Sequence, residues 1–243
     1  MSVDMQSPPL KTVLIIALDH SFSYSDNSRL DCWYEKLCTL LRQTCRVYGA
    51  VINSTALIFL DDDQYKFDAV VLTDPVIMSR RNLYPELTDK LVSYVQDGGT
   101  LIFAPYCRLG FGSNVQATDV DSYMERVWGL PWKLGTADTR EFKLNDEANI
   151  RNGEYWLSML LGRNIFAVQL DGAEAENKLY IDPDGAGSPA IFASYERGYL
   201  CWLGDVLLQK ATVWMMIILG NLRPEEQPED TAAGSAVTLS DAA

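Results

Sequence analysis

The sequence offers few side chains that could carry acid–base or nucleophilic chemistry, and histidine is the scarcest of them. It contains one histidine, His20, and five cysteines. A cysteine attacks through its thiolate, which a neighbouring base or cation favours. Cys107 is the candidate nucleophile, because Arg108 follows it and would lower the pKa of the thiol if the two side chains lay together. The alternative interpretation is an ordinary loop thiol.

His20 is the one imidazole that could take a proton from that thiol. It follows Asp19 directly after the apolar run at 12–18. A dyad of Cys107 and His20, oriented by Asp19 or by Asp74, would suit a hydrolase or lyase that acts on a small carboxylate or amide metabolite. No motif supports this dyad, so the alternative is a surface histidine or a simple polar contact.

Asp205 is a further candidate at the end of an apolar run, in the sequence LGD. Its carboxylate could face a ligand together with Asp19 and Arg108, which are the other binding candidates. The alternative, which we favour, is that Asp205 is the N-cap of the helix predicted to follow, because aspartate is a preferred N-cap residue.

Two acidic stretches suggest metal binding only weakly. In DDDQ at 61–64, three adjacent carboxylates cannot all point at one ion, so we interpret the stretch as a solvated loop. Asp182 and Asp184 in IDPDGAG resemble part of a calcium loop, but no glutamate follows at the required spacing. A turn is predicted there, and neither a metal site nor a cofactor is expected.

The elements that must position these residues alternate between strand and helix. Continuous apolar runs predict buried strands at 12–18, 46–52, 67–74 and 100–104. Helical spacing of apolar residues predicts helices over 26–44 and 84–96. The carboxyl ends of parallel strands converge on one crevice, where Asp19, His20, Asp74 and Cys107 would lie.

The second half of the chain has a different pattern. Strands are predicted at 166–170, 178–181, 189–195 and 199–205, with a hairpin turn at 196–198 and a closing helix over 206–219. The sheet is therefore expected to be mixed, with antiparallel strands at one edge. The segment at 128–142 is interpreted as a loop and strand that could cover the crevice.

Three stretches read together resemble the class I glutamine amidotransferase-like superfamily, in the type found in β-galactosidase trimerisation domains and related stand-alone proteins. They are FDAVVLTDP, LVSYVQDGGTLIFAP and YERGYLCWLGDV, within roughly residues 10–222. The resemblance implies an α/β fold with a flavodoxin-like, doubly wound, mostly parallel sheet and antiparallel edge strands.

The resemblance also indicates which chemistry is missing. Glutaminases of this superfamily use a cysteine at a strand-to-helix elbow and a histidine with a neighbouring acid late in the chain. No histidine follows His20 here, and Tyr106 and Arg108 flank Cys107 where the family has small residues. An imidazole base contributes ~10²–10⁴-fold in rate. We therefore expect a binding or interaction module without glutaminase activity.

Length and composition set the remaining expectations. The 243 residues suit one domain at 11–222, with an N-terminal extension at 1–10 and a disordered acidic tail at 223–243. A net charge of −13 argues against nucleic acid as a partner, and no apolar run reaches the ~20 residues that span a membrane. Cysteines without a CxxC pair favour the cytoplasm. A small-molecule ligand in the crevice and a homo-oligomer are the partners considered.

Overall fold

A six-stranded sheet forms the centre of the computed structural model, with strand order β2-β1-β3-β4-β10-β9. The structure describes residues 10–18, 27–79, 81–104, 115–148, 164–183, 185, 187–205 and 210–223. Five strands are parallel and β9 is antiparallel to its neighbour β10. The strands are β1 (Thr12–Ile16), β2 (Arg46–Ala50), β3 (Ala69–Leu72), β4 (Thr100–Phe103), β9 (Ala190–Tyr195) and β10 (Gly198–Leu203).

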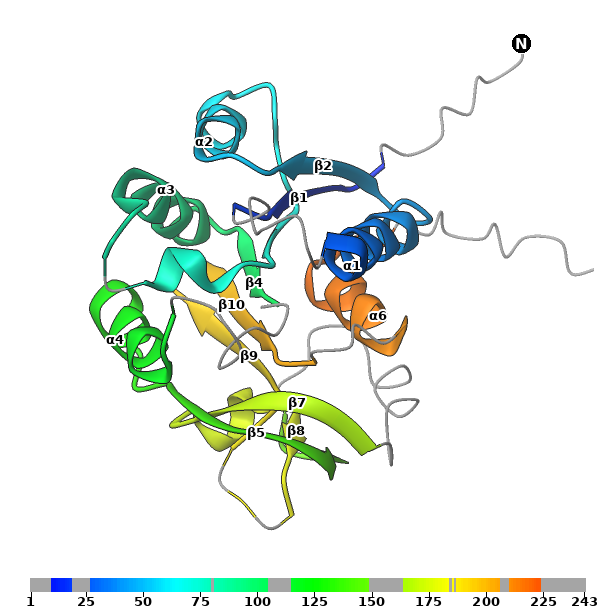
Figure 1. Cartoon of the computed structure of the whole chain (residues 1–243), viewed down its shortest axis with the longest axis vertical. Coiled ribbons are helices and arrows are strands. Elements are labelled where there is room, and N and C mark those ends of the chain that lie inside the picture. The colour runs from blue at the N-terminus through cyan, green and yellow to red at the C-terminus, as the bar shows by residue number, and fades with distance from the viewer. Residues whose placement is uncertain are drawn as a thin grey trace, which may run out of the picture.

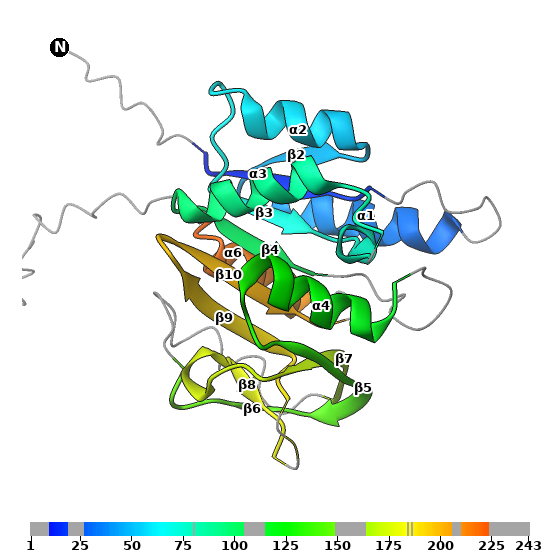
Figure 2. The same ribbon diagram turned by 90° about the vertical axis from the view of Figure 1, so that its left-hand side faces the viewer.

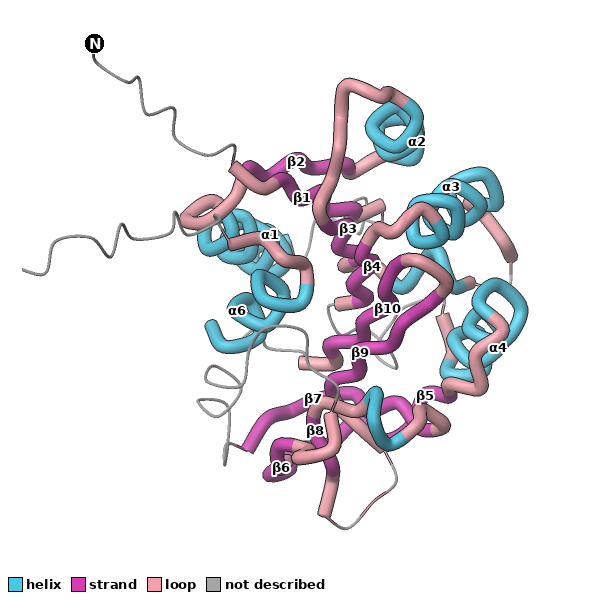
Figure 3. The backbone as a smooth tube through the Cα atoms, turned by 180° about the vertical axis from the view of Figure 1, so that it is seen from behind, coloured by secondary structure: helices cyan, strands magenta, loops and turns pink. Residues whose placement is uncertain are grey.

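Helices cover both faces of this sheet, as Figures 1 and 3 show. One face packs against α1 (Asn27–Leu41) and α6 (Lys210–Leu219). The other packs against α2 (Asn53–Asp61), α3 (Pro85–Gln96) and α4 (Ala117–Trp128). Every residue of β3 and β4 is buried, which explains why these strands are continuously apolar. The predicted doubly wound α/β sheet with an antiparallel edge is confirmed.

Two small sheets extend the molecule beyond β9 (Figure 2). In one, β5 (Lys133–Glu141) pairs antiparallel with β7 (Asn164–Asp171), and in the other β6 (Lys143–Leu144) pairs with β8 (Tyr180–Ile181). Single bridges connect them to the main sheet, such as Lys178 to Ile191 of β9. The strands predicted at 166–170 and 178–181 therefore exist, but they belong to these small sheets. Short 3₁₀ turns form η1 (Pro75–Met78) and η3 (Ala175–Asn177).

Two helices were not predicted from the sequence. The sequence of α2, NSTALIFLD, has apolar residues on all sides and so lacks a helical stripe. By contrast, α4 carries a recognisable signal, a capping box between Gln116 and Asp119 followed by buried Val120, Tyr123 and Met124. The segment at 128–142 begins with the last residue of α4. Its strand, β5, lies at the β9 end of the sheet and not over β1 and β3 (Figure 2).

The hairpin predicted at 196–198 is present between β9 and β10, and Glu196 adopts a left-handed conformation with φ of 51°. The closing helix is observed from Lys210 onward. No helix in the described part of the chain is long and apolar enough to cross a membrane.

Candidate functional site

The carboxyl ends of β1, β3, β4 and β10 lie along one edge of the sheet, because these neighbouring strands are parallel. The order of connections reverses between β1 and β3, since β1 leads through α1 to β2 on one side while β3 lies on the other. Ligands of open α/β sheets bind at such a reversal. This crevice is the candidate site, and the predicted residues follow its strands in the sequence.

Four of the six predicted site residues lie outside the described residues, namely Asp19, His20, Cys107 and Arg108. The topology nevertheless orders the segments that carry them. His20 follows β1 and Cys107 follows β4, and β3 lies between these two strands. Asp74 follows β3, the strand that lies between β1 and β4 in the sheet.

Asp74 is half-buried, and one of its contacts is structural. Its Oδ1 accepts a hydrogen bond of 3.3 Å from the backbone N–H of Val76, which caps the 3₁₀ turn η1. Just before it, the backbone N–H and the hydroxyl of Thr73 both donate to the carbonyl oxygen of Ile16, at 3.1 and 3.2 Å. These bonds join the carboxyl ends of β1 and β3 at the candidate site.

Asp205 is buried on the other side of the sheet, with 8% of its surface exposed. Its Oδ2 accepts a hydrogen bond from the hydroxyl of Thr212, in the first turn of α6. Next to it is a cavity of about 20 Å³, which is room for about one water molecule. The cavity is otherwise mainly apolar, with Phe142, Tyr180, Leu203 and Met215 in its wall. Asp205 therefore anchors α6 through the side chain of Thr212. The predicted N-cap role of Asp205 stays a prediction, because residues 206–209, which precede the described start of α6, are not described.

Asp74 and Asp205, the two predicted acids that the structure describes at this edge, do not belong to one cluster. The turn after Asp74 packs with α4 on one face, whereas Asp205 contacts α6 on the other. Among the described residues no group of three histidine, cysteine, aspartate or glutamate side chains could hold a metal ion. Asp74 and Asp205 thus have separate surroundings.

Three of the five thiols are buried and are poor nucleophiles. Cys38, Cys45 and Cys201 are each less than 5% exposed. Burial raises the pKa of all three thiols, in the case of Cys45 to about 11. Since the thiolate is the reactive form, these positions react slowly at neutral pH. Cys45 lies beyond the end of α1.

An ion pair between the small sheets, with one buried partner, was not predicted from the sequence. Arg140 Nη1 lies 2.6 Å from Oδ2 of Asp182, whose side chain is 3% exposed. Gln169 Nε2 donates to the same oxygen at 3.4 Å. The turn predicted at 182 is present, because the N–H of Gly185 donates to the Asp182 carbonyl. No local pattern in the sequence indicates this contact, because Arg140 and Asp182 are 42 residues apart.

A surface groove of about 380 Å³ runs between α3 and α4. Both polar and apolar side chains line it, including Asn82, Thr88, Asp89 and Arg126. It was not anticipated, because α4 was not predicted. The volume of the groove suits a small ligand. Its lining includes one acidic and one basic side chain, Asp89 and Arg126, so it shows no preference for a ligand of one charge.

No protein-family model matches this sequence, and no curated protein sequence matches it. Solved structures do share its fold. A cytoplasmic protein from Salmonella typhimurium LT2, STM1381, has a TM-score of 0.51 at 15% identity, over 87% of this chain and 99% of that one. Gan42B, a GH42 β-galactosidase from G. stearothermophilus, has a TM-score of 0.50 at 11% identity, over 89% of this chain and 31% of that one. A β-galactosidase from the Antarctic haloarchaeon Halorubrum lacusprofundi has a TM-score of 0.49 at 14% identity, over 92% and 32%.

The chain therefore spans about a third of the length of these β-galactosidases and nearly all of the Salmonella protein. At such low identities the likeness shows the fold alone. That fold is the class I glutamine amidotransferase-like fold, as the three sequence stretches predicted.

Proposed function

We propose that this chain is a glutamine amidotransferase-like domain without glutaminase activity, and that it works as a binding and interaction module. The observation that carries the proposal is the environment of Asp205, the acid that follows the last strand of the main sheet. It holds the hydroxyl of Thr212 and borders a mainly apolar cavity, and no histidine follows His20 in the sequence. A late imidazole paired with an acid is therefore missing.

The crevice at the ends of β1 and β3 remains suited to a small ligand. Its position at the reversal of strand order supports ligand binding whether or not a reaction follows. We propose a small carboxylate or amide metabolite as the ligand, bound near Asp19 and Arg108. The buried thiols and the cytoplasmic Salmonella protein of the same fold support a cytoplasmic location.

Ammonia release from glutamine tests the absence of glutaminase activity. The purified full chain and its Cys107→Ala variant are incubated with glutamine, and ammonia is measured over time. We expect the two proteins to release ammonia at the same background rate, because no late imidazole activates the thiol. Release by the wild-type chain that is lost in Cys107→Ala would overturn the proposal.

A second function, a hydrolase or lyase, is favoured by one feature of the topology. The segments that carry His20 and Cys107 follow β1 and β4, the two strands on either side of β3. In that mechanism His20 would take the proton of the Cys107 thiol, and Asp74 would orient the imidazole.

Alkylation by iodoacetamide separates the two functions. The rate of modification of Cys107 is measured by mass spectrometry from pH 5 to pH 9, in the wild-type chain and in His20→Ala. If the chain is a binding module, Cys107 should be alkylated rapidly only as the pH approaches the ordinary thiol pKa of about 8.5. Rapid labelling of Cys107 near pH 6 that disappears in His20→Ala would establish the enzyme instead.

A further inference from the structure

The two edges of the main sheet are protected to different extents. At the β9 edge, the N–H of Leu179 donates to the carbonyl of Ala190 at 2.8 Å, and Lys178 bridges to Ile191. At the other edge, β2 pairs within the described residues with β1 alone. Figure 1 shows β2 as the outermost strand of the sheet.

Alternate residues of β2 bond to β1, so the residues between them point their backbone groups outward. Arg46 N donates to Lys11 O at 2.8 Å, and Ala50 O accepts from Ala17 N at 2.9 Å. The outward donors and acceptors therefore belong to Val47, Gly49 and Val51. A row of this kind is a template for pairing with another strand.

Two devices that usually protect a sheet edge, a bulge and a proline, are absent from β2. Its register with β1 continues without a bulge from Arg46 to Ala50, and the sequence has no proline between 46 and 52. Arg46 is the one charged residue of the strand. Edge strands of monomeric proteins commonly carry lysine, proline or a bulge.

Apolar side chains beside this edge are exposed. The exposed fractions are 44% for Val51, 57% for Ile52 and 61% for Ile58. In α2 the apolar run 56–60 contains one buried residue, Ala56. Within this run Ile58 is exposed, whereas Leu57, Phe59 and Leu60 are half-buried against the core. Ile58, Val51 and Ile52 therefore form a small exposed apolar group beside the strand edge.

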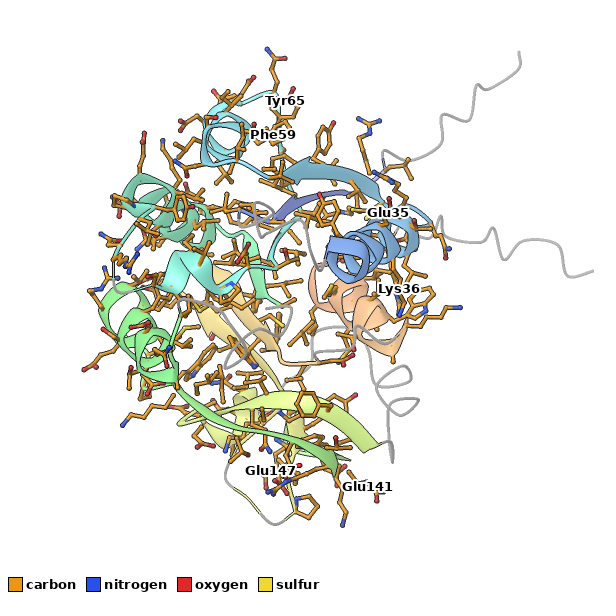
Figure 4. The ribbon with its side chains drawn as sticks, in the orientation of Figure 1. Glu35, Lys36, Phe59, Tyr65, Glu141 and Glu147 are labelled. Atoms are coloured by element: carbon orange, nitrogen blue, oxygen red, sulfur yellow. The ribbon has the colours of Figure 1, made fainter. Side chains whose placement is uncertain are left out.

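A cluster of four aromatic side chains holds α2 firmly against β2. Tyr48, Phe59, Tyr65 and Phe67 contact one another, with ring centroids 5.0 to 6.2 Å apart. Figure 4 shows Phe59 and Tyr65 at this end of the molecule. The strand edge and the exposed face of α2 thus form one preorganised surface, which we call the β2 edge surface (residues 46–63).

Neither end of α2 carries the charge that a helix dipole prefers. At its N-terminus the N-cap is Ile52, which makes no side-chain cap, and the first turn has no acid. The C-terminal end of α2 has three carboxylates, because Asp61 is the last residue of the helix and Asp62 and Asp63 follow it. The last turn has no basic residue. Asp61 pairs with Lys90, whereas Asp63 is exposed. The helix dipole favours negative charge at the N-terminus and positive charge at the C-terminus.

We propose that the β2 edge surface is the interface of a two-fold homodimer, in which β2 pairs antiparallel with β2 of a second copy about an axis through Gly49. The surface is self-complementary in this arrangement. Val47 faces Val51 of the second copy, and no like charges face each other. Because α2 packs back along β2, the two α2 helices are antiparallel, and the acidic end of each lies toward the uncapped N-terminus of the other.

This charge complementarity favours a second copy over an unrelated strand as the occupant. A two-fold interface uses the same patch on both subunits, so each patch must contain both halves of every interaction. The β2 edge surface contains an apolar pair, an acidic helix end and an uncapped helix start. The proposal goes beyond the proposed function and does not depend on whether Cys107 reacts.

Sedimentation equilibrium of the full chain tests the proposal. We expect a mass twice the chain's 27.2 kDa in the micromolar range. Val51→Lys should raise the dimer dissociation constant by at least about tenfold, because it places a charge in the pairing edge. Leu83→Lys is the matched control, since Leu83 is 51% exposed on another surface, and it should remain dimeric. A monomeric wild-type chain would overturn the proposal, as would equal weakening by both variants.

Asp63→Lys separates the interface from an effect on folding. Lysine at this position complements the dipole of its own helix, so the thermal midpoint of the monomer should not fall. It also repels the N-terminus of the other α2, so the dissociation constant should rise. Unchanged dimerisation of Asp63→Lys would remove α2 from the interface.

The register is tested by cross-linking two variants, Val47→Cys and Val51→Cys, under mild oxidation. In the proposed pairing, Val47 and Val51 of the other copy form a hydrogen-bonded pair about 5.5 Å apart between Cα atoms, which is within the range of a disulfide. We expect a covalent dimer in much higher yield from the mixture than from either variant alone. Equal yields, or none, would overturn the axis through Gly49. Neither result bears on ammonia release, so this proposal and the proposed function fail separately.

Discussion

The carboxylate of Asp205 accepts a hydrogen bond from the hydroxyl of Thr212, and both residues are buried. Asp205 also forms a single antiparallel bridge with Ala167 of β7. One residue thus joins the end of β10 to the first turn of α6 and to the small sheet. The described contacts of Asp205 therefore stabilise the fold.

Replacing Thr212 by valine should therefore destabilise the protein. Valine has nearly the same shape, but it leaves the buried carboxylate of Asp205 without this donor. The expected loss in the free energy of unfolding is about 1.5–3 kcal/mol, which is what one hydrogen bond to a charged group contributes. Urea unfolding followed by tryptophan fluorescence measures it.

Thr139→Val is the matched control for this experiment. Thr139 is exposed in β5, so its substitution should change stability by no more than about 0.5 kcal/mol. If Thr212→Val proved as stable as this control, Asp205 would have another sufficient partner, and its anchoring role would be wrong.

The ion pair of Arg140 with Asp182 should be worth more than a surface pair, because the side chain of Asp182 is 3% exposed. Arg140→Met keeps much of the length of the side chain but removes its charge. We expect a measurable loss in the free energy of unfolding, because the substitution removes the cation that lies against the buried carboxylate of Asp182. Arg197→Met is a suitable control, because the pair of Arg197 with Asp97 is exposed on both sides and should contribute less than about 1 kcal/mol.

A double variant shows whether the effect belongs to the pair. In Arg140→Met with Asp182→Asn, the buried charge is gone, so part of the lost stability should return. Strictly additive losses in chemical denaturation would contradict a direct interaction between the two side chains.

Tyr123 should make the protein sensitive to alkali. Burial raises the pKa of this side chain to about 12, and its hydroxyl approaches Thr88 and Trp128 without a well-formed hydrogen bond. In the unfolded chain the phenol ionises near pH 10. Between pH 10 and pH 12 the unfolded state therefore holds fewer protons than the folded state, so the stability present below pH 10 is lost as the pH rises.

Tyr123→Phe should lose less stability over this pH range than the wild-type chain, by up to about 1.4 kcal/mol per pH unit. Below pH 9 the two proteins should differ by less than about 1 kcal/mol. Unfolding in urea at pH 8, 10 and 11 provides the comparison. Parallel pH profiles would mean that the phenol ionises equally well in the folded state.

The strands of the main sheet were predictable because burial on both faces requires continuous apolar runs. The runs at 12–18 and 100–104 show this clearly, since β1 and β4 are buried along almost their whole length. The helix α2 was not predictable in the same way. Its apolar residues follow one another without a period, because some of them face solvent in the single chain.

The candidate site was predicted at the level of topology only. The alternation of strand and helix predicted parallel strands, and the observed strand order places the carboxyl ends of β1, β3 and β4 along one edge. The surroundings of Asp74 and Asp205 could not be read from the sequence, because their partners come from a 3₁₀ turn and from a helix side chain. The Arg140–Asp182 pair depends on a contact across 42 residues, which no local pattern specifies.

Gly198 shows that two of the stretches that resemble the superfamily, LVSYVQDGGTLIFAP and YERGYLCWLGDV, are in direct contact. A Cβ atom at this position would lie 2.2 Å from the carbonyl oxygen of Val95 and 2.3 Å from that of Gly99. These oxygens belong to the turn between α3 and β4, so the hairpin of YERG packs directly on the turn of DGG. Backbone oxygens cannot move aside as a flexible side chain can.

Gly198→Ala should therefore cost about 1–3 kcal/mol or more, as overpacking does in a well-packed core. Gly129→Ala is the informative control. Gly129 has a φ of 65° but open space around its Cα, so alanine there should cost only the left-handed strain of about 1–2 kcal/mol. The thermal midpoints of the two variants compare the effects. If Gly198→Ala were the milder change, the hairpin and the α3–β4 turn would not be in contact, and the shared motif would need another physical cause.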